Sequence, residues 1–499
     1  MKCLLKYAGF ERAATVAFCL VFLAGLSAWA VEARIASPLP AIPRYAFDIE
    51  LDYVGHRLHA VERVTLPNPS GMTLSELVFN VPPVHSAGVF YLHNVLVRDE
   101  SIPVHPDSTL LTVTLPSELL SDEVVTLTLD FSLYIEPLGP EVESFAAANL
   151  GYTDDVLTVG YWYPVLAPYQ PGLGWLSVPW HSVGDPFASE SADYTATITA
   201  TPGIEIVAGG EMTRQENVWH FNLPHGRMFA FIASDRYRQM DITLSGVTYS
   251  LYTFAEHAHL MPVTMQTIVR SAWLYNSLYG AYPYTSLRVA EVSGPWSMEF
   301  SGLVTLGFDE FANYNGTERN RLVRITAHEV SHQWWYSVVG NDQAREPWLD
   351  ECLARFNELR YYEFYSPGDV GWWWNAVLSY AEPHRTVDSA AYDFRYHNSY
   401  IGVIYNRGAM FLDELRTQIG KAAFHDFLRD WYQFGSWRIA TASDFFATLT
   451  RHTRADVRPA MWPFFAATAL DSLRTFDSGG HSTPLQADVK PATKDRLEE

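Results

Sequence analysis

The chain is poor in cysteine, with three in 499 residues: Cys3, Cys19 and Cys352. The first two lie in an N-terminal segment that resembles an export signal, so a processed chain would keep a single thiol. One thiol excludes an internal disulfide. An exported protein of this composition, 48% hydrophobic and 14% aromatic, would therefore depend for its stability on packing in large cores.

Basic residues are also scarce: the chain has 34 Lys and Arg but 56 Asp and Glu, which gives a formal net charge of -22. So strong a negative charge argues against a nucleic-acid partner. It favours cationic ligands, although solubility explains it equally well. The sequence shows no internal repeats and, after the N-terminal segment, no apolar run of transmembrane length.

Residues 1–30 have the features of a signal peptide or a signal anchor. A basic start is followed by an uncharged, mostly apolar run over 13–31, which contains Ala28-Trp29-Ala30, an A-x-A cleavage pattern. The run is close to transmembrane length, so an uncleaved membrane anchor stays open as an alternative. We therefore predict an exported protein, extracytoplasmic or secreted, with residues 31–44 as a proline-rich linker.

Two regions of different periodicity follow the linker. From 45 to 253, short β-type runs alternate with turns, which predicts an N-terminal antiparallel β domain of saddle or sandwich type. From 254 to 476 the apolar spacing is mostly helical, and 477–499 is a polar tail predicted to be disordered. The expected fold class is therefore multidomain α+β. Helices are expected at 262–278, 321–338, 348–362, 409–418, 422–434 and 454–469, and a strand at 287–292.

A metal-binding pattern lies in the helical region. His328 and His332 are four residues apart, one turn along a helix, so both imidazoles can reach the same metal ion. Glu351, on the next expected helix, is the candidate third ligand, and Glu329 is placed to act on a metal-bound water. Two imidazoles and one carboxylate, with a fourth position left for water, indicate one catalytic Zn²⁺ ion.

Two further residues share the expected helix of Glu351. Glu358 follows it by seven residues, two helical turns, and could hydrogen-bond a ligand histidine. Cys352 adjoins Glu351 and is either a fourth ligand or a small buried helix residue. Packing is the preferred interpretation, because adjacent helical positions point about 100° apart.

These motifs resemble the aminopeptidase N family of gluzincin metallopeptidases, which includes leukotriene A4 hydrolase. The segment His328–Trp335 resembles the HExxHQW motif of the family, and Trp348–Ala354 resembles its W-L-N-E-G-F-A segment, with Cys352 in place of Gly. Glu358 matches a further Glu of the family. The resemblance covers most of the chain after the signal. It implies a β domain followed by a thermolysin-like catalytic domain, a bound zinc ion and peptide substrates.

Two more segments carry the resemblance. Glu299 lies in a segment like the family's G-x-M-E-N, whose Glu binds the free α-amine of the substrate. Tyr405 begins a segment like Y-x-K-G-A, whose Tyr hydroxyl stabilises the tetrahedral intermediate. Trp296 and Phe300 depart from the first motif, replacing its Gly and Asn. No residue of the β domain is identified as the second amine-binding group.

The residues and the resemblance together predict zinc-dependent peptide-bond hydrolysis that removes N-terminal residues from peptides. In this interpretation Glu329 is the general base, Tyr405 stabilises the oxyanion and Glu299 binds the substrate. Two alternatives stay open: a zinc endopeptidase or other hydrolase without amine recognition, and a non-catalytic peptide-binding module on the same fold. The expected partners are peptide substrates, with a membrane only if the N-terminal segment is an anchor.

Overall fold

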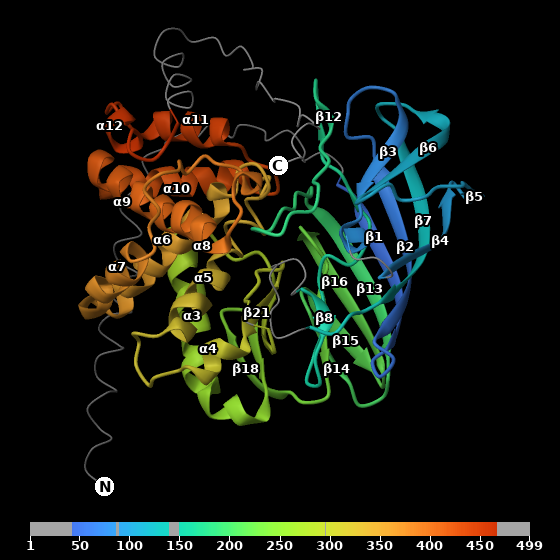
Figure 1. Ribbon diagram of the computed structural model, residues 1–499, viewed down its shortest axis with the longest axis horizontal. Coiled ribbons are helices and arrows are strands. Elements are labelled where there is room, and N and C mark those ends of the chain that lie inside the picture. Colours follow the sequence, from blue (N-terminus) through green and yellow to red (C-terminus); the bar gives the residue numbers. More distant parts are fainter. Residues whose placement is uncertain (1–41, 86–88, 139–148, 295, 467–499) are drawn as a thin grey trace, which may run out of the picture. The chain divides into compact units, whose positions relative to one another are not determined.

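The computed structural model describes residues 42–85, 89–138, 149–294 and 296–466 (Figure 1). The expected signal segment, nearly all of the expected linker and the polar tail lie outside the described residues. Residues from Ile42 onward form one unit by their contacts. No helix in the described part of the chain is long and apolar enough to cross a membrane.

An eight-stranded sheet dominates the N-terminal part, because buried and exposed side chains alternate along its strands. In β1, Tyr45, Phe47 and Ile49 are buried and the residues between them are exposed. The strand order is β15-β16-β13-β1-β2-β7-β4-β5. The strands are β1 (Arg44–Asp52), β2 (Arg57–Pro67), β4 (Phe90–Val97), β5 (Glu100–Ser101), β7 (Val124–Tyr134), β13 (Ala192–Ala200), β15 (Glu211–Gln215) and β16 (Val218–Gly226).

One pair in this sheet departs from the expected antiparallel arrangement. Strands β1 and β13 are parallel, with Tyr45 opposite Tyr194, whereas the other neighbouring pairs are antiparallel. The two strands are distant in sequence, so no hairpin constrains their direction. The pairing fixes the start of β13 beside β1, and the segment that precedes β13 reaches the candidate site.

Smaller sheets complete the β-rich part (Figure 1). Their orders are β10-β3-β6, β14-β17-β9-β8 and β11-β12. The strands and the one short helix are β3 (Leu74–Asn80), β6 (Leu110–Leu119), β8 (Leu150–Tyr152), β9 (Leu157–Val159), β10 (Val165–Leu166), β11 (Tyr169–Gln170), β12 (Gly174–Trp175), β14 (Glu205–Ala208), β17 (Phe231–Ser234) and η1 (Pro82–His85).

A four-stranded sheet leads into the helical part, in the order β18-β19-β20-β21. Strand β19 (Val247–Thr253) pairs with β18 (Arg238–Leu244) and runs parallel to β20 (Ser286–Val292), which runs parallel to β21 (Leu303–Gly307). A crossover through η2 (Ala255–Leu260) and α3 (Met261–Leu278) makes the first parallel pairing possible. The boundary expected at residue 253 therefore falls inside one sheet.

Helices form the rest of the described chain, and most of the expected ones are confirmed. They are α4 (Phe308–Ala312), α5 (Arg321–Ser331), α6 (Trp348–Tyr365), η3 (Pro367–Asp369), α7 (Val370–Leu378), η4 (Ala391–Asp393), α8 (His397–Tyr400), η5 (Ile401–Arg407), α9 (Gly408–Ile419), α10 (Lys421–Gly435), α11 (Ala442–His452) and α12 (Arg458–Met461).

Two expected helices were too long. The helix expected at 321–338 ends at Ser331, because the chain then turns tightly and Tyr336 adopts a φ of 130°, outside the helical region. Of the helix expected at 454–469, only α12 forms within the described residues. Pro463 follows it, and proline has no backbone N–H with which to continue the helical hydrogen bonds.

A buried arginine joins the β-rich part to the loop after α5. The guanidinium of Arg227, 1% exposed, donates to the carbonyl oxygens of Ser337 and Val338, which follow the histidine pair. It also donates to Ser189, in the segment before β13, and to Arg438. Such a charge is stable in the interior only when its donors are satisfied. The contact holds the β-domain segment against the metal-binding region.

Candidate metal centre and active-site cleft

Three side chains from α5, its C-cap and α6 converge on one point. Nε2 of His328 lies 3.2 Å from Nε2 of His332 and 3.2 Å from Oε2 of Glu351. Nε2 of His332 lies 3.4 Å from the same oxygen of Glu351. All three residues are buried. Helices α5 and α6 are tied together here by a hydrogen bond of 2.6 Å from Asn357 to Ser331.

The three atoms fit a zinc ion. Ligand atoms about 2.0–2.1 Å from a tetrahedral zinc lie roughly 3.3 Å from one another, which agrees with the observed separations of 3.2 to 3.4 Å. Two imidazole nitrogens and one carboxylate oxygen are also a donor set that zinc prefers. Cys352 is not part of this group. It is buried against Gly408, where a Cβ would lie 2.2 Å from the Cβ of Cys352.

Two polar contacts orient both imidazoles toward this point. Oε1 of Glu358 lies 3.0 Å from Nδ1 of His328. The Nδ1 atom of His332 lies 2.9 Å from the carbonyl oxygen of Trp335, where a ring N–H can donate. Each contact occupies the nitrogen away from the other ligands, which leaves Nε2 free to bind a metal.

Glu358 itself is buried among cationic and polar donors. Arg355 donates to its Oε1 at 2.6 Å, Trp373 donates to its Oε2 at 2.8 Å, and Arg324 lies 3.5 Å from Oε2. Burial alone would raise the pKa of this carboxyl, but Arg355, Arg324 and His328 hold the pKa well below its usual range. Glu358 is therefore an anion that supports the ligand imidazole.

Glu329 lies in the cleft beside the ligand group. It is 6% exposed, and its Oε2 atom has no hydrogen-bond partner among the described residues. Burial, followed by the charge of Glu299, raises the pKa of its carboxyl. A buried carboxylate oxygen without a partner that faces a cleft is available to a water or a substrate group.

Tyr405 reaches the same cleft from η5, a helix of π type. Its ring stacks on the imidazole of His328 with centroids 5.6 Å apart and planes 8° apart. The guanidinium of Arg355 lies 5.4 Å from the centre of the Tyr405 ring. Burial raises the pKa of the Tyr405 hydroxyl, and the Glu351 carboxylate raises it further, so the group keeps its proton and can donate it in a hydrogen bond.

Glu299 lies on the side of the cleft where His332 lies. A carboxylate oxygen of Glu299, a ring nitrogen of His332 and a carboxylate oxygen of Asp350 lie within 4.8 Å of one another. The amide of Gln343 donates to both acids, at 3.1 Å to Glu299 and 2.9 Å to Asp350. Gln333 holds the backbone after Glu299 with two hydrogen bonds. Its side-chain oxygen accepts from the N–H of Gly302, and its side-chain nitrogen donates to the carbonyl oxygen of Phe300.

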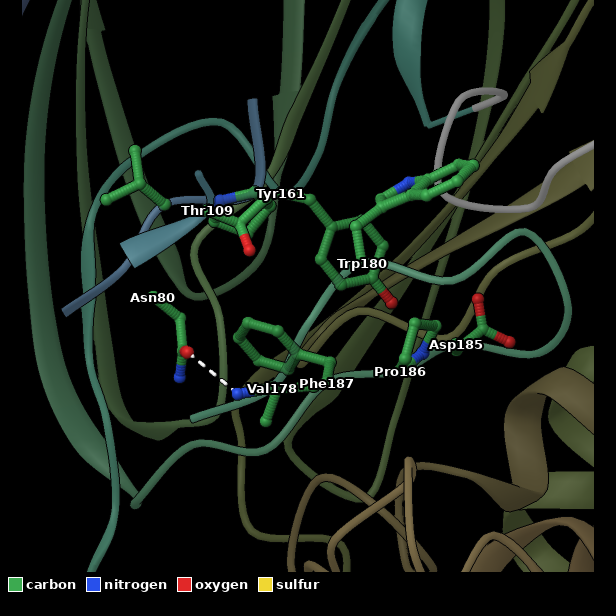
Figure 2. Close-up of a pocket in the computed structure, with 10 residues that line it drawn as sticks. Asn80, Thr109, Tyr161, Val178, Trp180, Asp185, Pro186 and Phe187 are labelled. Carbon is green, nitrogen blue, oxygen red and sulfur yellow. Dashed lines mark hydrogen bonds between the residues drawn. The ribbon is translucent and has the colours of Figure 1, made fainter. Parts of the chain in front are cut away.

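Asp185 is a site residue that no motif in the sequence indicated. It comes from the segment between β12 and β13, lines the metal cleft, and has a buried Oδ1 atom without a partner among the described residues. It also lines a small apolar pocket with Tyr161 and Phe187, in which Asp185 and Asn80 lie on opposite sides (Figure 2). Burial, and then the charge of Glu299, raises the pKa of Asp185. The β domain thus adds a carboxyl group to the Glu299 side of the cleft.

The cleft encloses about 1480 Å³ of empty space that is open to solvent. Trp296 and Trp372 line it, whereas Phe300 is buried against Gly160 and Tyr161 and is not among its lining residues. Phe300 therefore acts in packing, and Trp296 is the departure from the family motif that meets the cleft. The seven residues to which the sequence assigned a catalytic, binding or supporting role lie in or directly behind the cleft: Glu299, His328, Glu329, His332, Glu351, Glu358 and Tyr405.

Comparison with known proteins identifies related peptidases. Residues 263–464 match the Peptidase family M1 domain. The chain is 26% identical over 140 residues to Endoplasmic reticulum aminopeptidase 2 of Homo sapiens, covering 26% of this chain and 14% of that protein. It is 22% identical over 305 residues to Glutamyl aminopeptidase of Homo sapiens, covering 55% and 31%. These matches thus span less than a third of the length of either relative.

Solved structures show the same fold. An M1 zinc metallopeptidase from Deinococcus radiodurans superimposes with a TM-score of 0.61 at 19% identity, covering 89% of this chain and 95% of that one. A mutant of that protein bound to a Tyr-Ser-Ala substrate gives a TM-score of 0.60 at 19% identity, covering 84% and 92%. The match over residues 263–464 and the aminopeptidase relatives support an aminopeptidase N-like gluzincin family of M1 metallopeptidases, and the solved M1 zinc metallopeptidases share the fold. The expected fold, a β domain followed by a helical catalytic domain, is confirmed.

Proposed function

We propose that this protein is a zinc aminopeptidase that hydrolyses the first peptide bond of its substrates. The observation that carries the proposal is the position of Glu299, whose carboxylate lies within 4.8 Å of the ring nitrogen of His332. The amine nitrogen and the carbonyl carbon of one residue are about 2.5 Å apart. An α-amine bound by Glu299 would therefore bring the carbonyl group of its own residue to the metal centre.

Asp185 strengthens amine recognition in this proposal. It adds a second carboxyl group from the β domain, and its buried Oδ1 lacks a partner among the described residues. A protonated α-amine offers three donors, which two carboxylates can accept by charge-assisted hydrogen bonds. Asp185 would thus supply the second amine-binding group that no sequence motif identified.

The chain's own residues divide the remaining chemistry. His328, His332 and Glu351 would hold one zinc ion, which when bound supplies a Lewis acid that lowers the pKa of water toward neutrality. Glu329 would take a proton at Oε2 as water attacks and later pass it to the leaving amine. Tyr405 would donate a hydrogen bond to the oxyanion that develops on the carbonyl oxygen. Glu358 keeps His328 in the tautomer that presents Nε2.

The test is a panel of matched peptides with free and N-acetylated N-termini, incubated with the zinc-loaded protein. We expect cleavage of the free peptides, at least about 100-fold slower cleavage of acetylated ones, and loss of both with a chelator. Equal cleavage of free and acetylated peptides would establish the endopeptidase alternative instead. Absence of turnover in a protein that binds both zinc and peptides would establish the non-catalytic module.

Two variants locate amine recognition within the cleft. Glu299→Gln and Asp185→Asn should each reduce the preference for free over acetylated peptides, because each removes a negative charge from the amine side. Glu318→Gln is the matched control, since Glu318 forms an ion pair with Arg270 and does not line the cleft. An unchanged preference in both cleft variants would refute amine binding at this position.

Export is a separate proposal that rests on residues 1–30, which lie outside the described residues. Their basic start, apolar run and A-x-A pattern support secretion or membrane anchoring. N-terminal sequencing of the protein from fractionated cells tests it. A mature chain beginning near residue 31 indicates cleavage, an intact chain in the membrane fraction indicates anchoring, and an intact soluble chain in the cytosol refutes export.

A further inference from the structure

Three arginines line the cleft of an otherwise acidic protein: Arg321, Arg324 and Arg355. Arg321 has a full partner, because it donates to both oxygens of Glu310, and its side chain is 60% exposed. Arg324 and Arg355 are different, since their side chains are 11% and 6% exposed and both share the single carboxylate of Glu358. Two buried guanidinium groups with one carboxylate leave one positive charge in excess.

The donors of this pair are incompletely used. The Nε atom of Arg355 is buried and has no hydrogen-bond partner among the described residues. Arg324 has one long contact of 3.5 Å to Glu358, and burial lowers the pKa of its guanidinium. A buried guanidinium is stable when its five donors are satisfied, and carboxylates satisfy them best. The pair therefore has capacity for one more anionic group.

The pair and the amine-binding acids approach different histidines of the metal centre. Glu299 approaches His332, whereas Arg355 is linked to the other histidine, because Oε1 of Glu358 contacts both Arg355 and Nδ1 of His328. A peptide whose amine is bound beside His332 and whose first carbonyl lies at the metal would continue toward His328. The arginines would then face the part of the substrate that follows the scissile bond.

We propose that Arg324 and Arg355 form a carboxylate-binding subsite for the leaving half of the substrate, which recognises the free α-carboxylate of di- and tripeptides. This inference rests on the proposed aminopeptidase function. Because one residue spans at most about 3.6 Å, only a C-terminus one or two residues beyond the scissile bond stays close to the metal centre. An acidic side chain directly after the scissile bond offers the same chemistry and is a separate arm of the test.

The experiment compares alanine peptides of two, three and six residues, each as the free acid and as the C-terminal amide, with the zinc-loaded protein. We expect kcat/KM to favour the acid about tenfold or more for the two short peptides and to be nearly equal for the hexapeptide. The dipeptide amide Ala-Glu-NH₂ separates the two carboxylate sources: rapid cleavage assigns the subsite to side chains instead of C-termini. An acid-to-amide ratio near one at every length overturns the subsite.

Variants assign the preference to the two arginines. Arg324→Gln and Arg355→Gln should bring the acid-to-amide ratio of the dipeptide close to one, and the ratio cancels any loss that affects both peptides alike. Arg319→Gln is the matched control, because Arg319 is 57% exposed, pairs with Asp369 and lies outside the cleft. A ratio that stays at its original value in both cleft variants overturns the assignment.

A binding measurement separates this inference from the proposed catalysis. In the Glu329→Gln protein loaded with zinc, calorimetry should show about tenfold tighter binding of Ala-Ala than of its amide. Adding Arg324→Gln should abolish the difference. If the wild-type protein cleaves no peptide but this difference appears, the aminopeptidase proposal fails and the subsite stands. Equal binding of acid and amide overturns the subsite whatever the turnover.

Discussion

Oε1 of Glu358 lies 3.0 Å from Nδ1 of His328, the ring nitrogen that neither Glu351 nor His332 contacts. The carboxylate therefore selects the tautomer with a proton on Nδ1 and an open lone pair on Nε2. Three further donors, from Arg324, Arg355 and Trp373, hold that carboxylate in place. The geometry of the metal centre thus depends on a residue that does not reach the metal position itself.

Replacing Glu358 with Gln should weaken zinc binding by about 10- to 100-fold, because a neutral amide supports the imidazole less well than a carboxylate. The dissociation constant for zinc, measured by competition with a chelator, tests this. Glu363→Gln is the control on the same helix, since Glu363 pairs with Arg416 away from the metal centre. Equal zinc affinity in the Glu358→Gln protein would contradict the role of the contact between Glu358 and His328.

Glu329→Gln should lower kcat by about 100- to 10,000-fold while zinc content stays at the original level. The substitution removes the proton acceptor but keeps the side-chain volume, and Glu329 is not a member of the candidate ligand group. Steady-state kinetics on a free peptide, together with metal analysis of the same sample, are the measurement. Peptidase activity within a few-fold of the original would eliminate Glu329 as the general base.

Tyr405→Phe should lower kcat by about 100- to 1,000-fold with little change in KM, because the hydroxyl is proposed to act on the developing oxyanion alone. The phenyl ring can still stack on His328 as the tyrosine ring does. Tyr400→Phe is a suitable comparison, since Tyr400 packs edge-on against Tyr405 without lining the cleft. Equal losses in the two variants would indicate a packing role for Tyr405.

Glu62→Met should stabilise the protein, with a gain of about 1–3 kcal/mol in the free energy of unfolding at pH 8. Glu62 occupies a core position of β2, is 0% exposed, and neither of its carboxyl oxygens has a partner among the described residues. Burial raises its pKa well above the usual range. The folded chain therefore keeps the proton, while the unfolded side chain loses it above about pH 4.3.

The sign of the pH dependence follows from that shift. As the pH rises above the unfolded pKa toward the raised folded pKa, unfolding releases a proton and the free energy of unfolding falls. Denaturant unfolding should show that the free energy of unfolding falls less between pH 5 and pH 8 for Glu62→Met than for the original chain. Glu50→Met, at an exposed position of β1, should leave the decline unchanged. A parallel decline in the Glu62→Met protein would contradict the prediction.

Local spacing predicted the class of fold and the candidate ligands that converge in the structure. His328 and His332 share a helical face because four residues make about one turn, and Glu358 lies two turns beyond Glu351 for the same reason. Short β-type runs separated by turns likewise indicated the β domain before the helices. The end of α5 was missed, because the positive φ of Tyr336 depends on the contacts of the turn and not on apolar periodicity.

Only tertiary structure could bring together groups that have no fixed spacing in sequence. Asp185 reaches the cleft because the parallel pairing of β1 and β13 and the buried Arg227 place its segment beside the helices. Gln343 joins Glu299 to Asp350, and Arg324 meets Arg355 across Glu358, through contacts between separate elements. Short-range helix geometry determines which residues share a face. The packing of distant segments determines which faces meet, and here it determined which charged side chains line the cleft.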